Sequence, residues 1–253
     1  MIVYPIRSNL AKPGDSVPEL FSDAIARTHL RLKSGDIVAI SSKIVGITEN
    51  RIRYLDSIRP GSEARSLARK YTLAPAFAQA VLDESDTVVG GVKGALLTVK
   101  IGDAVANAGI DRKNAPEGAV VLWPRNPDLS ARSIRRSIQR KSGRNVGVVI
   151  VDSRVSPLRR GTTGFAIGCA GFEPIEDMRG RVDLSGRRIE ITLRAIADGI
   201  AAAAQLVMGE AADRIPFAIV RDTPVTFGSA RGIRSAKLAW NQCLYMSHIP
   251  TRQ

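Results

Sequence analysis

The chain has 253 residues, of which 44% are hydrophobic and 5% aromatic, and its formal net charge at pH 7 is +13. This composition supports a sizeable buried core and excludes an intrinsically disordered chain. No apolar run reaches about eighteen residues and the first residues lack a signal-peptide pattern, so we expect a cytoplasmic protein without a membrane span.

The N-terminal half alternates short apolar runs with turn-rich segments. We predict strands at residues 2–6 and 36–41, joined through a loop at 9–15 and a helix. Ser16 and Glu19 match a capping box, so this helix is expected to begin there. The later elements predicted in this half are helices at Pro60–Tyr71 and Pro75–Glu84, then strands at 87–89, 95–101, 104–107 and 119–123.

The C-terminal half contains the most apolar run of the chain, Val146–Val151, which predicts a buried strand. A basic amphipathic helix at Asp128–Ser142 precedes it, with Gly143 as a suitable C-cap. Beyond a segment rich in glycine and threonine at 159–171, the expected elements are a strand at Arg188–Leu193, a helix at Arg194–Met208 and a strand at Ile215–Val220.

These elements interleave without regular strand–helix–strand repeats. We therefore predict an α+β fold with mixed sheets, in one unit of two lobes whose internal boundary no linker marks. Residues 223–253 form a weakly patterned tail.

The positive charge raises the question of nucleic-acid binding. The basic residues are dispersed, and aromatic residues for stacking on single strands are scarce. Nucleic acid is therefore not the expected partner, and a basic face can instead attract phosphates or another anionic small substrate.

Two aspartates stand out as candidate ligands of a divalent metal. Asp111 follows a predicted strand, and Asp152 directly follows the most apolar one. Carboxylates beside small residues suit Mg²⁺ or Mn²⁺. Ser153, directly after Asp152, and Glu210, just past the end of a predicted helix, are further oxygen donors. Each acid is equally compatible with a turn or cap, which the sequence leaves open.

Three glycine-rich segments, 161–164, 168–171 and 208–212, can cradle phosphate through backbone N–H groups or serve close packing and turns. The P-loop and GxGxxG spacings are absent, so a nucleotide site here is non-standard. The two histidines, His29 and His248, have no partner motif, which argues against zinc hydrolases and Ser-His-Asp triads. The two cysteines lack a metal-ligand spacing, and Cys169 is expected to be buried and inert.

Several ordered blocks of sequence resemble the coenzyme F420-0:γ-glutamyl ligase family. The matching blocks, spread over roughly residues 2 to 222, are Val38–Val45 (VAISSKIV), Asn107–Asn114 (NAGIDRKN), Val148–Ser153 (VVIVDS), Arg160–Gly168 (RGTTGFAIG), Asp183–Arg187 (DLSGR), Ala197–Ala204 (ADGIAAAA) and Leu206–Glu210 (LVMGE).

The resemblance implies a ligase that depends on GTP and on Mg²⁺ or Mn²⁺, with K⁺ as a further candidate ion. A substrate carboxylate, that of F420-0, would attack the γ-phosphate of GTP to give an acyl phosphate. The amino group of L-glutamate would then displace phosphate and form an amide. The resemblance also implies a γ-glutamyl ligase-like fold with interlocked lobes and a homodimer.

By position, the resemblance gives Asp111 and Asp152 a catalytic role as ligands of one metal, and makes Ser153 and Glu210 ligands of a second. The residues that it implies for GTP binding are Asn9, Leu10, Ser42, Lys43, Asn114, Gln205, Met208, Gly209, Glu210 and Ala211.

The chain departs from the family pattern at three places. Ile47 replaces a lysine of the family pattern that resembles a nucleotide contact. The N-terminal loop is shorter than in the family, and the residues after Ser153 differ. The acceptor is therefore less constrained than the reaction class. A folate-like acceptor, or a non-catalytic relative that binds nucleotide or nucleic acid, are the alternatives.

Overall fold

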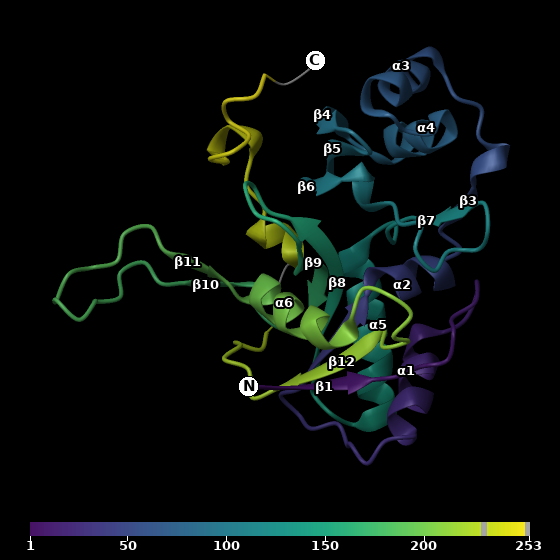
Figure 1. Cartoon of the computed structure of the whole chain (residues 1–253). Coiled ribbons are helices and arrows are strands. Elements are labelled where there is room, and N and C mark those ends of the chain that lie inside the picture. Colours follow the sequence, from purple (N-terminus) through teal and green to yellow (C-terminus); the bar gives the residue numbers. More distant parts are fainter. Residues whose placement is uncertain (229–231, 251–253) are drawn as a thin grey trace.

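The computed structural model describes residues 1–228 and 232–250. Its centre is a five-stranded mixed sheet with strand order β1-β12-β2-β8-β9 (Figure 1). Strands β2 and β8 are parallel, and the other neighbours are antiparallel. The bounds of the strands are β1 Ile2–Ile6, β2 Ile37–Ser41, β8 Gly147–Val155, β9 Thr162–Ala170 and β12 Phe217–Arg221.

Both faces of this sheet are buried, because successive side chains point to opposite sides. In β2, Val38 and Ile40 pack in one hydrophobic cluster with helices α1 (Val17–Ala26) and α5 (Pro127–Ser142). Their neighbours Ile37 and Ala39 pack in another cluster with helix α6, Ile196–Met208. The sheet is thus the middle layer between helices, as continuous apolar runs predict.

A smaller part of the molecule has its own core. Strands β4 (Thr87–Val92), β5 (Ala95–Lys100) and β6 (Asp103–Ala106) form an antiparallel sheet, beside which helices α3 (Ser62–Tyr71) and α4 (Pro75–Glu84) lie (Figure 1). A separate hydrophobic cluster joins α4 to β5 and to the end of β7. The two-stranded ladder of β3 (Ile52–Tyr54) with β7 (Ala119–Val121) completes this part.

Strands β10 (Ile175–Asp177) and β11 (Leu193–Ala195) begin a long hairpin that projects away from the rest of the molecule (Figure 1). We call residues 175–195 the arm. The remaining elements are short: helix α2 at Ser42–Thr48 and the 3-10 turns η1 Leu55–Ser57, η2 Asn107–Gly109, η3 Ile233–Ala236 and η4 Trp240–Gln242.

The predicted class, α+β with mixed sheets, is confirmed. Within the described residues, none of the helices combines the length and apolar character that crossing a bilayer requires. In the tail, η3 and η4 are the regular elements between residues 232 and 250, while 229–231 and 251–253 lie outside the described part.

Helix α1 begins directly after Ser16, as predicted, but the capping box and one strand were predicted wrongly. The Ser16 side chain makes no capping hydrogen bond; the Ser16 backbone carbonyl instead accepts from the Glu19 N–H at 3.0 Å. The strand predicted at Arg188–Leu193 lies mostly in the arm's tip, and only Leu193 belongs to β11. The residues before Leu193 meet the opposite limb of the arm only through separate contacts, such as the Gly180 N–H to the Ile189 carbonyl at 2.8 Å and the isolated bridge between Val182 and Arg188.

The sequence pattern predicted no strand in the segment rich in glycine and threonine, where β9 lies. Two of its glycines are required by packing. A Cβ on Gly164 would lie 2.4 Å from the Ala201 carbonyl oxygen of α6, and one on Gly168 would lie 2.5 Å from the backbone of Pro127 in α5. Helices therefore approach this strand closely on both faces, and these two glycines serve the close packing that the sequence had left open as an alternative.

A buried ion pair links two neighbouring strands at one end of the central sheet. Asp36, 1% exposed, accepts two hydrogen bonds of 2.7 Å from the Arg221 guanidinium, and Arg221 also donates to the Arg31 carbonyl at 2.9 Å. This pair joins the start of β2 to the end of β12. Its two charges satisfy each other where water has little access.

We expect Arg221→Met to lower the free energy of unfolding by about 3–5 kcal/mol, because it leaves the Asp36 carboxylate buried without its partner. Urea denaturation followed by circular dichroism measures the change. Arg179→Met is the matched control: its pair with Asp177 is exposed on the arm, and its denaturation curve should overlie that of the wild type. A wild-type midpoint for Arg221→Met would contradict the role of the pair.

Candidate functional site

A cavity of about 670 Å³ lies beside the point where β2 ends and α2 begins. Its size is that of a site for a nucleotide-sized ligand. It is lined by the loop after β1, the β2–α2 junction, Ile52 of β3, Asp111 with residues 114–116, residues 151–153 of β8, and the end of α6 with the following turn.

The parallel pairing of β2 with β8 sets the position of Asp152. Ser41, the last residue of β2, pairs with Val151, so Asp152 is the first residue of β8 beyond the end of its neighbour. We expected Asp152 after its strand, but it lies within β8, which continues to Val155 alongside β9. A register shift between Ile150 and Val151 bends the ladder just before it.

Asp111 reaches the same cavity from the smaller part of the molecule. Its backbone pairs with Val121 through two hydrogen bonds, of 3.0 and 2.8 Å. Its carboxylate receives the Lys113 backbone N–H at 2.6 Å through one oxygen and the Lys43 ammonium at 2.7 Å through the other. Lys43 belongs to the first turn of α2, so the junction after β2 supplies the cation that faces Asp111.

The Asp152 carboxylate is partly buried and hydrogen-bonded through both oxygens. One accepts from the Ser153 backbone N–H at 2.8 Å, and the other accepts from the indole N–H of Trp123. The pKa of Asp152 is raised to about 6. Loss of hydration on burial is the main cause and the negative charge of Asp111 adds to it, while the two hydrogen bonds and Lys43 act in the opposite direction.

The end of α6 and the turn that follows it contribute another group of lining residues. The Gln205 side chain donates to the Glu210 carboxylate at 2.5 Å, and Asn114 donates to the Ala211 carbonyl at 3.0 Å. Gly209 has φ +74°, and a Cβ there would lie 2.2 Å from the Asp213 carboxylate, so this turn requires glycine. The turn after α6 is thereby attached to the segment that carries Asp111.

The structure brings together every residue that sequence reasoning assigned to the site. The residues from those predictions that line the cavity are Asn9, Leu10, Ser42, Lys43, Asp111, Asn114, Asp152, Ser153, Gln205, Met208, Gly209, Glu210 and Ala211. This is a statement of position; their individual roles stay predictions.

The oxygen donors of the cavity are candidate ligands of a metal ion. Asp111 and Asp152 are close enough for their charges to interact, and the Ser153 hydroxyl is adjacent. Glu210 lines the same cavity, but no three Asp, Glu, His or Cys side chains among the described residues form a single cluster. The two carboxylates fit one hard divalent ion with phosphate oxygens completing its shell, and the hydroxyl is a further hard oxygen donor beside them.

Sequence reasoning missed several lining residues. Ser8, Lys12 and Arg214 line the cavity without belonging to a recognisable motif. Ile47, which stands in place of the expected lysine, also lines it and makes that part of the wall apolar. Trp123, which lies outside the lining but donates to Asp152, was also missed, because nothing in its sequence neighbourhood indicates an aspartate partner twenty-nine positions away.

A family described as F420-0:Gamma-glutamyl ligase matches residues 5–222. The chain belongs to the F420-0:γ-glutamyl ligase family.

Relatives named coenzyme F420:L-glutamate ligase support the same assignment. That of Archaeoglobus fulgidus is 40% identical over 220 residues, which cover 87% of this chain and 86% of the relative. That of Methanopyrus kandleri is 37% identical over 227 residues, covering 89% and 88%. The resemblance stated from sequence is confirmed, and this member of the F420-0:γ-glutamyl ligase family is an enzyme of the ligase class.

Other chemistries remain disfavoured in this ligase. Cys169 is fully buried in β9, and burial raises the pKa of its thiol far above the ordinary value, as expected of an inert residue. Of the three glycine-rich segments, 161–164 and 168–171 do not line the cavity. The 208–212 segment does line it.

We expect Asp111→Asn to lower the pKa of Asp152 from about 6, because it removes a neighbouring negative charge that disfavours ionisation. The carboxyl ¹³C shift of Asp152, followed from pH 3 to 8 in metal-free protein, measures this. Asp83→Asn is the control, since Asp83 pairs with Arg53 on the surface and lies outside the cavity lining. An unchanged Asp152 titration in Asp111→Asn would show that the two carboxylates do not interact.

Proposed function

We propose that this enzyme joins L-glutamate to the carboxylate acceptor F420-0, using GTP and a divalent metal, Mg²⁺ or Mn²⁺. The observation that carries the proposal is the convergence of all residues assigned from sequence on one cavity, in a chain of the F420-0:γ-glutamyl ligase family. The names of the relatives support the same acceptor and the same amino acid.

The charges of the cavity suit a triphosphate. Lys12, Lys43 and Arg214 line it together with Asp111 and Asp152. The basic side chains can neutralise phosphate oxygens directly, and the two aspartates can hold a cation that shields the remaining charge. We propose that Lys12 and Arg214 supply the positive charge that the family places at position 47, where this chain has isoleucine.

The proposed reaction has two steps. A carboxylate oxygen of the acceptor attacks the γ-phosphorus of GTP, the bond to the β-phosphate oxygen breaks, and GDP leaves. The uncharged amino group of L-glutamate then attacks the acyl carbon, the bond to the phosphate oxygen breaks, and the nitrogen loses a proton as the amide forms. A divalent ion bound when GTP is present would supply charge neutralisation to the transferring phosphoryl group.

The residues of the chain have separable parts in this scheme. Asp111 and Asp152 would hold one ion, and Ser153 and Glu210 would contribute to a second, with K⁺ as a further candidate. Asn9, Leu10, Ser42, Asn114, Gln205, Met208, Gly209 and Ala211 would contact the nucleotide. The attachments between the α6 turn and Asn114 would keep water from the phosphates while the acyl phosphate exists.

We expect turnover when the protein is mixed with GTP, Mn²⁺, L-glutamate and F420-0, with GDP and the glutamylated product followed by mass spectrometry. Asp152→Asn should lower the rate by at least about a hundredfold, because a neutral amide binds the cation weakly. Asp83→Asn, a surface carboxylate changed in the same way, should keep the wild-type rate.

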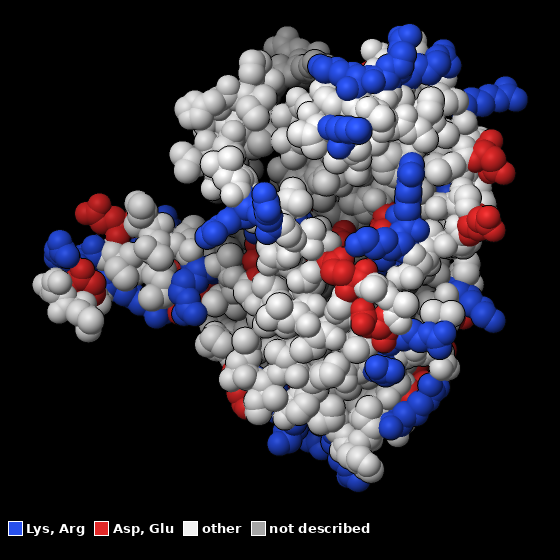
Figure 2. All heavy atoms as spheres, viewed as in Figure 1, with Lys and Arg blue, Asp and Glu red and all other residues white. Residues whose placement is uncertain are grey.

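Other outcomes would redirect the assignment. GDP formed only with a folate-like acceptor would change the substrate, and no GDP with any acceptor would refute the ligase reaction. Salt-sensitive RNA binding without turnover would support a nucleic-acid role. On the face in Figure 2, basic side chains are spread over the arm and over both parts of the molecule, with acidic ones between them, which disfavours that role.

We also propose a homodimer in which the arm packs against a second copy, giving interlocked lobes. The arm carries large apolar side chains in full contact with solvent, such as Leu184 (110% exposed) and Ile191 (87%). An isolated two-stranded hairpin is only marginally stable in water, so a partner surface would supply its missing contacts.

The dimer should be visible as twice the 27.2 kDa chain mass in light scattering at micromolar concentration. The double change Leu184→Asp, Ile191→Asp is expected to give monomers, because the charges would be buried at the interface. Leu129→Asp places the same charge on an exposed position of α5 and should leave the dimer intact. A monomeric wild type would refute this part of the proposal.

A further inference from the structure

One short segment, from Val121 to Trp123, is bonded to both aspartates of the cavity. Val121 exchanges backbone hydrogen bonds with Asp111, and two residues later the indole N–H of Trp123 donates to the Asp152 carboxylate. The end of β7 therefore sets where Asp111 and Asp152 lie relative to each other. Trp123 itself does not line the cavity; it lies behind Asp152 and is 2% exposed.

The indole ring has little freedom to turn. Gly109, with φ +68°, lies against it: a Cβ at that position would be 2.1 Å from Nε1 of Trp123. On the side of the sheet, the ring centroid of Phe165 is 6.0 Å away, and Phe165 is the register partner of Asp152 in β9. The N–H is thus confined to the direction of the carboxylate.

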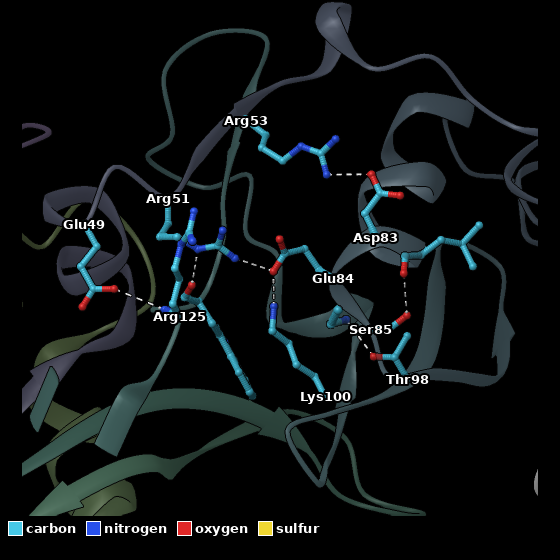
Figure 3. Close-up of polar contacts among 12 residues, drawn as sticks. Glu49, Arg51, Arg53, Asp83, Glu84, Ser85, Thr98, Lys100 and Arg125 are labelled. Atoms are coloured by element: carbon cyan, nitrogen blue, oxygen red, sulfur yellow. Dashed lines mark hydrogen bonds and ion pairs between the residues drawn. The ribbon is translucent and has the colours of Figure 1, made fainter. Parts of the chain in front are cut away.

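The backbone of Trp123 is fixed from the smaller part of the molecule. Nε of Arg51 donates to the Trp123 carbonyl at 3.0 Å, and the same guanidinium donates to Glu84 at 2.6 Å. Lys100, 5% exposed, donates to that Glu84 oxygen at 2.5 Å and lies 5.8 Å from the centroid of the Trp123 ring. Figure 3 shows Arg51, which precedes β3, and Lys100, the last residue of β5, pointing at Glu84.

These three charged residues are unusual for their position. They come from the start of β3, the end of α4 and β5, and all are largely shielded from water. Burying three charges is costly unless each is paired and hydrogen-bonded, which holds here. Apolar residues would stabilise this junction at lower cost, so packing alone does not explain the trio.

We propose that Trp123 is a positioning residue for the metal site: its indole N–H fixes the orientation of the Asp152 carboxylate, and the trio Arg51, Glu84 and Lys100 fixes Trp123. The inference rests on the proposed function, because Asp152 is taken as a metal ligand. A donor to a ligating carboxylate orients it before the ion arrives, and loss of such a partner costs about 10–100-fold in metal affinity.

The test is Trp123→Phe, which keeps an aromatic ring in the core and removes the N–H. We expect a folded protein by circular dichroism whose Mn²⁺ dissociation constant, from calorimetry in the presence of GDP, is about 10–100-fold higher. The Mn²⁺ concentration for half-maximal turnover should rise by the same factor, with kcat recovering at saturating Mn²⁺. Rescue by metal separates positioning from a general loss of structure.

Trp240→Phe is the matched control. It makes the same chemical change at the other tryptophan, whose indole N–H donates to the Ile249 carbonyl at 3.0 Å in the tail. Its Mn²⁺ affinity should equal that of the wild type.

A second measurement needs no folded Trp123 variant. The wild-type indole N–H signals in a ¹⁵N–¹H spectrum are those of Trp123 and Trp240. The Trp123 signal should shift in Asp152→Asn and broaden first when Mn²⁺ is added with GDP, while the Trp240 signal stays sharp.

Failure of this inference and of the proposed function are distinguishable. Wild-type Mn²⁺ affinity in Trp123→Phe, or a Trp123 signal that Mn²⁺ leaves sharp while the wild type binds Mn²⁺, would overturn the positioning role and leave the ligase assignment intact. A wild type that neither binds Mn²⁺ nor forms GDP would overturn the metal-dependent function, and the inference with it.

Discussion

The parallel pairing of β2 with β8 is the constraint on which the rest of the structure depends. Both strands are buried on both faces, so their register is fixed: a slip of one residue would exchange the two hydrophobic clusters. Because β2 ends opposite Val151, the chain leaves the sheet there to form α2, and Asp152 extends beside that exit. The cavity exists where one strand stops and its neighbour continues.

The Asp152 carboxylate is unfavourably placed for ionisation in the metal-free protein. Burial and the charge of Asp111 raise its pKa, so the ionised form is less favourable in the metal-free protein than in water. The N–H groups of Ser153 and Trp123 and the ammonium of Lys43 offset part of this cost. In the proposed function, a cation would favour the ionised form of Asp152 by offsetting the charge of the two carboxylates.

The sequence pattern predicted most of the helices and central strands because their apolar residues recur with the correct period. It failed where tertiary contacts override local preference. Helix α2 consists largely of β-branched residues, yet it forms where Gly46 packs against the Leu122 carbonyl. A Cβ on Gly46 would lie 2.3 Å from that carbonyl oxygen. Strand β9 needs Gly164 and Gly168 because helices cross it closely. Neither contact can be inferred from neighbours in the chain.

The candidate site divides in the same way. The order of short motifs was sufficient to name the family and many of the lining residues, because most of those residues lie in or beside recognisable blocks. Lys12, Arg214 and Trp123 carry no such signal, since their relevance arises only from proximity in space. The sequence by itself determined the class of fold, the family and the residues to examine. Only the tertiary structure decided that they meet in one cavity and which groups hold them, because burial and hydrogen bonding between distant segments are properties of the packed chain.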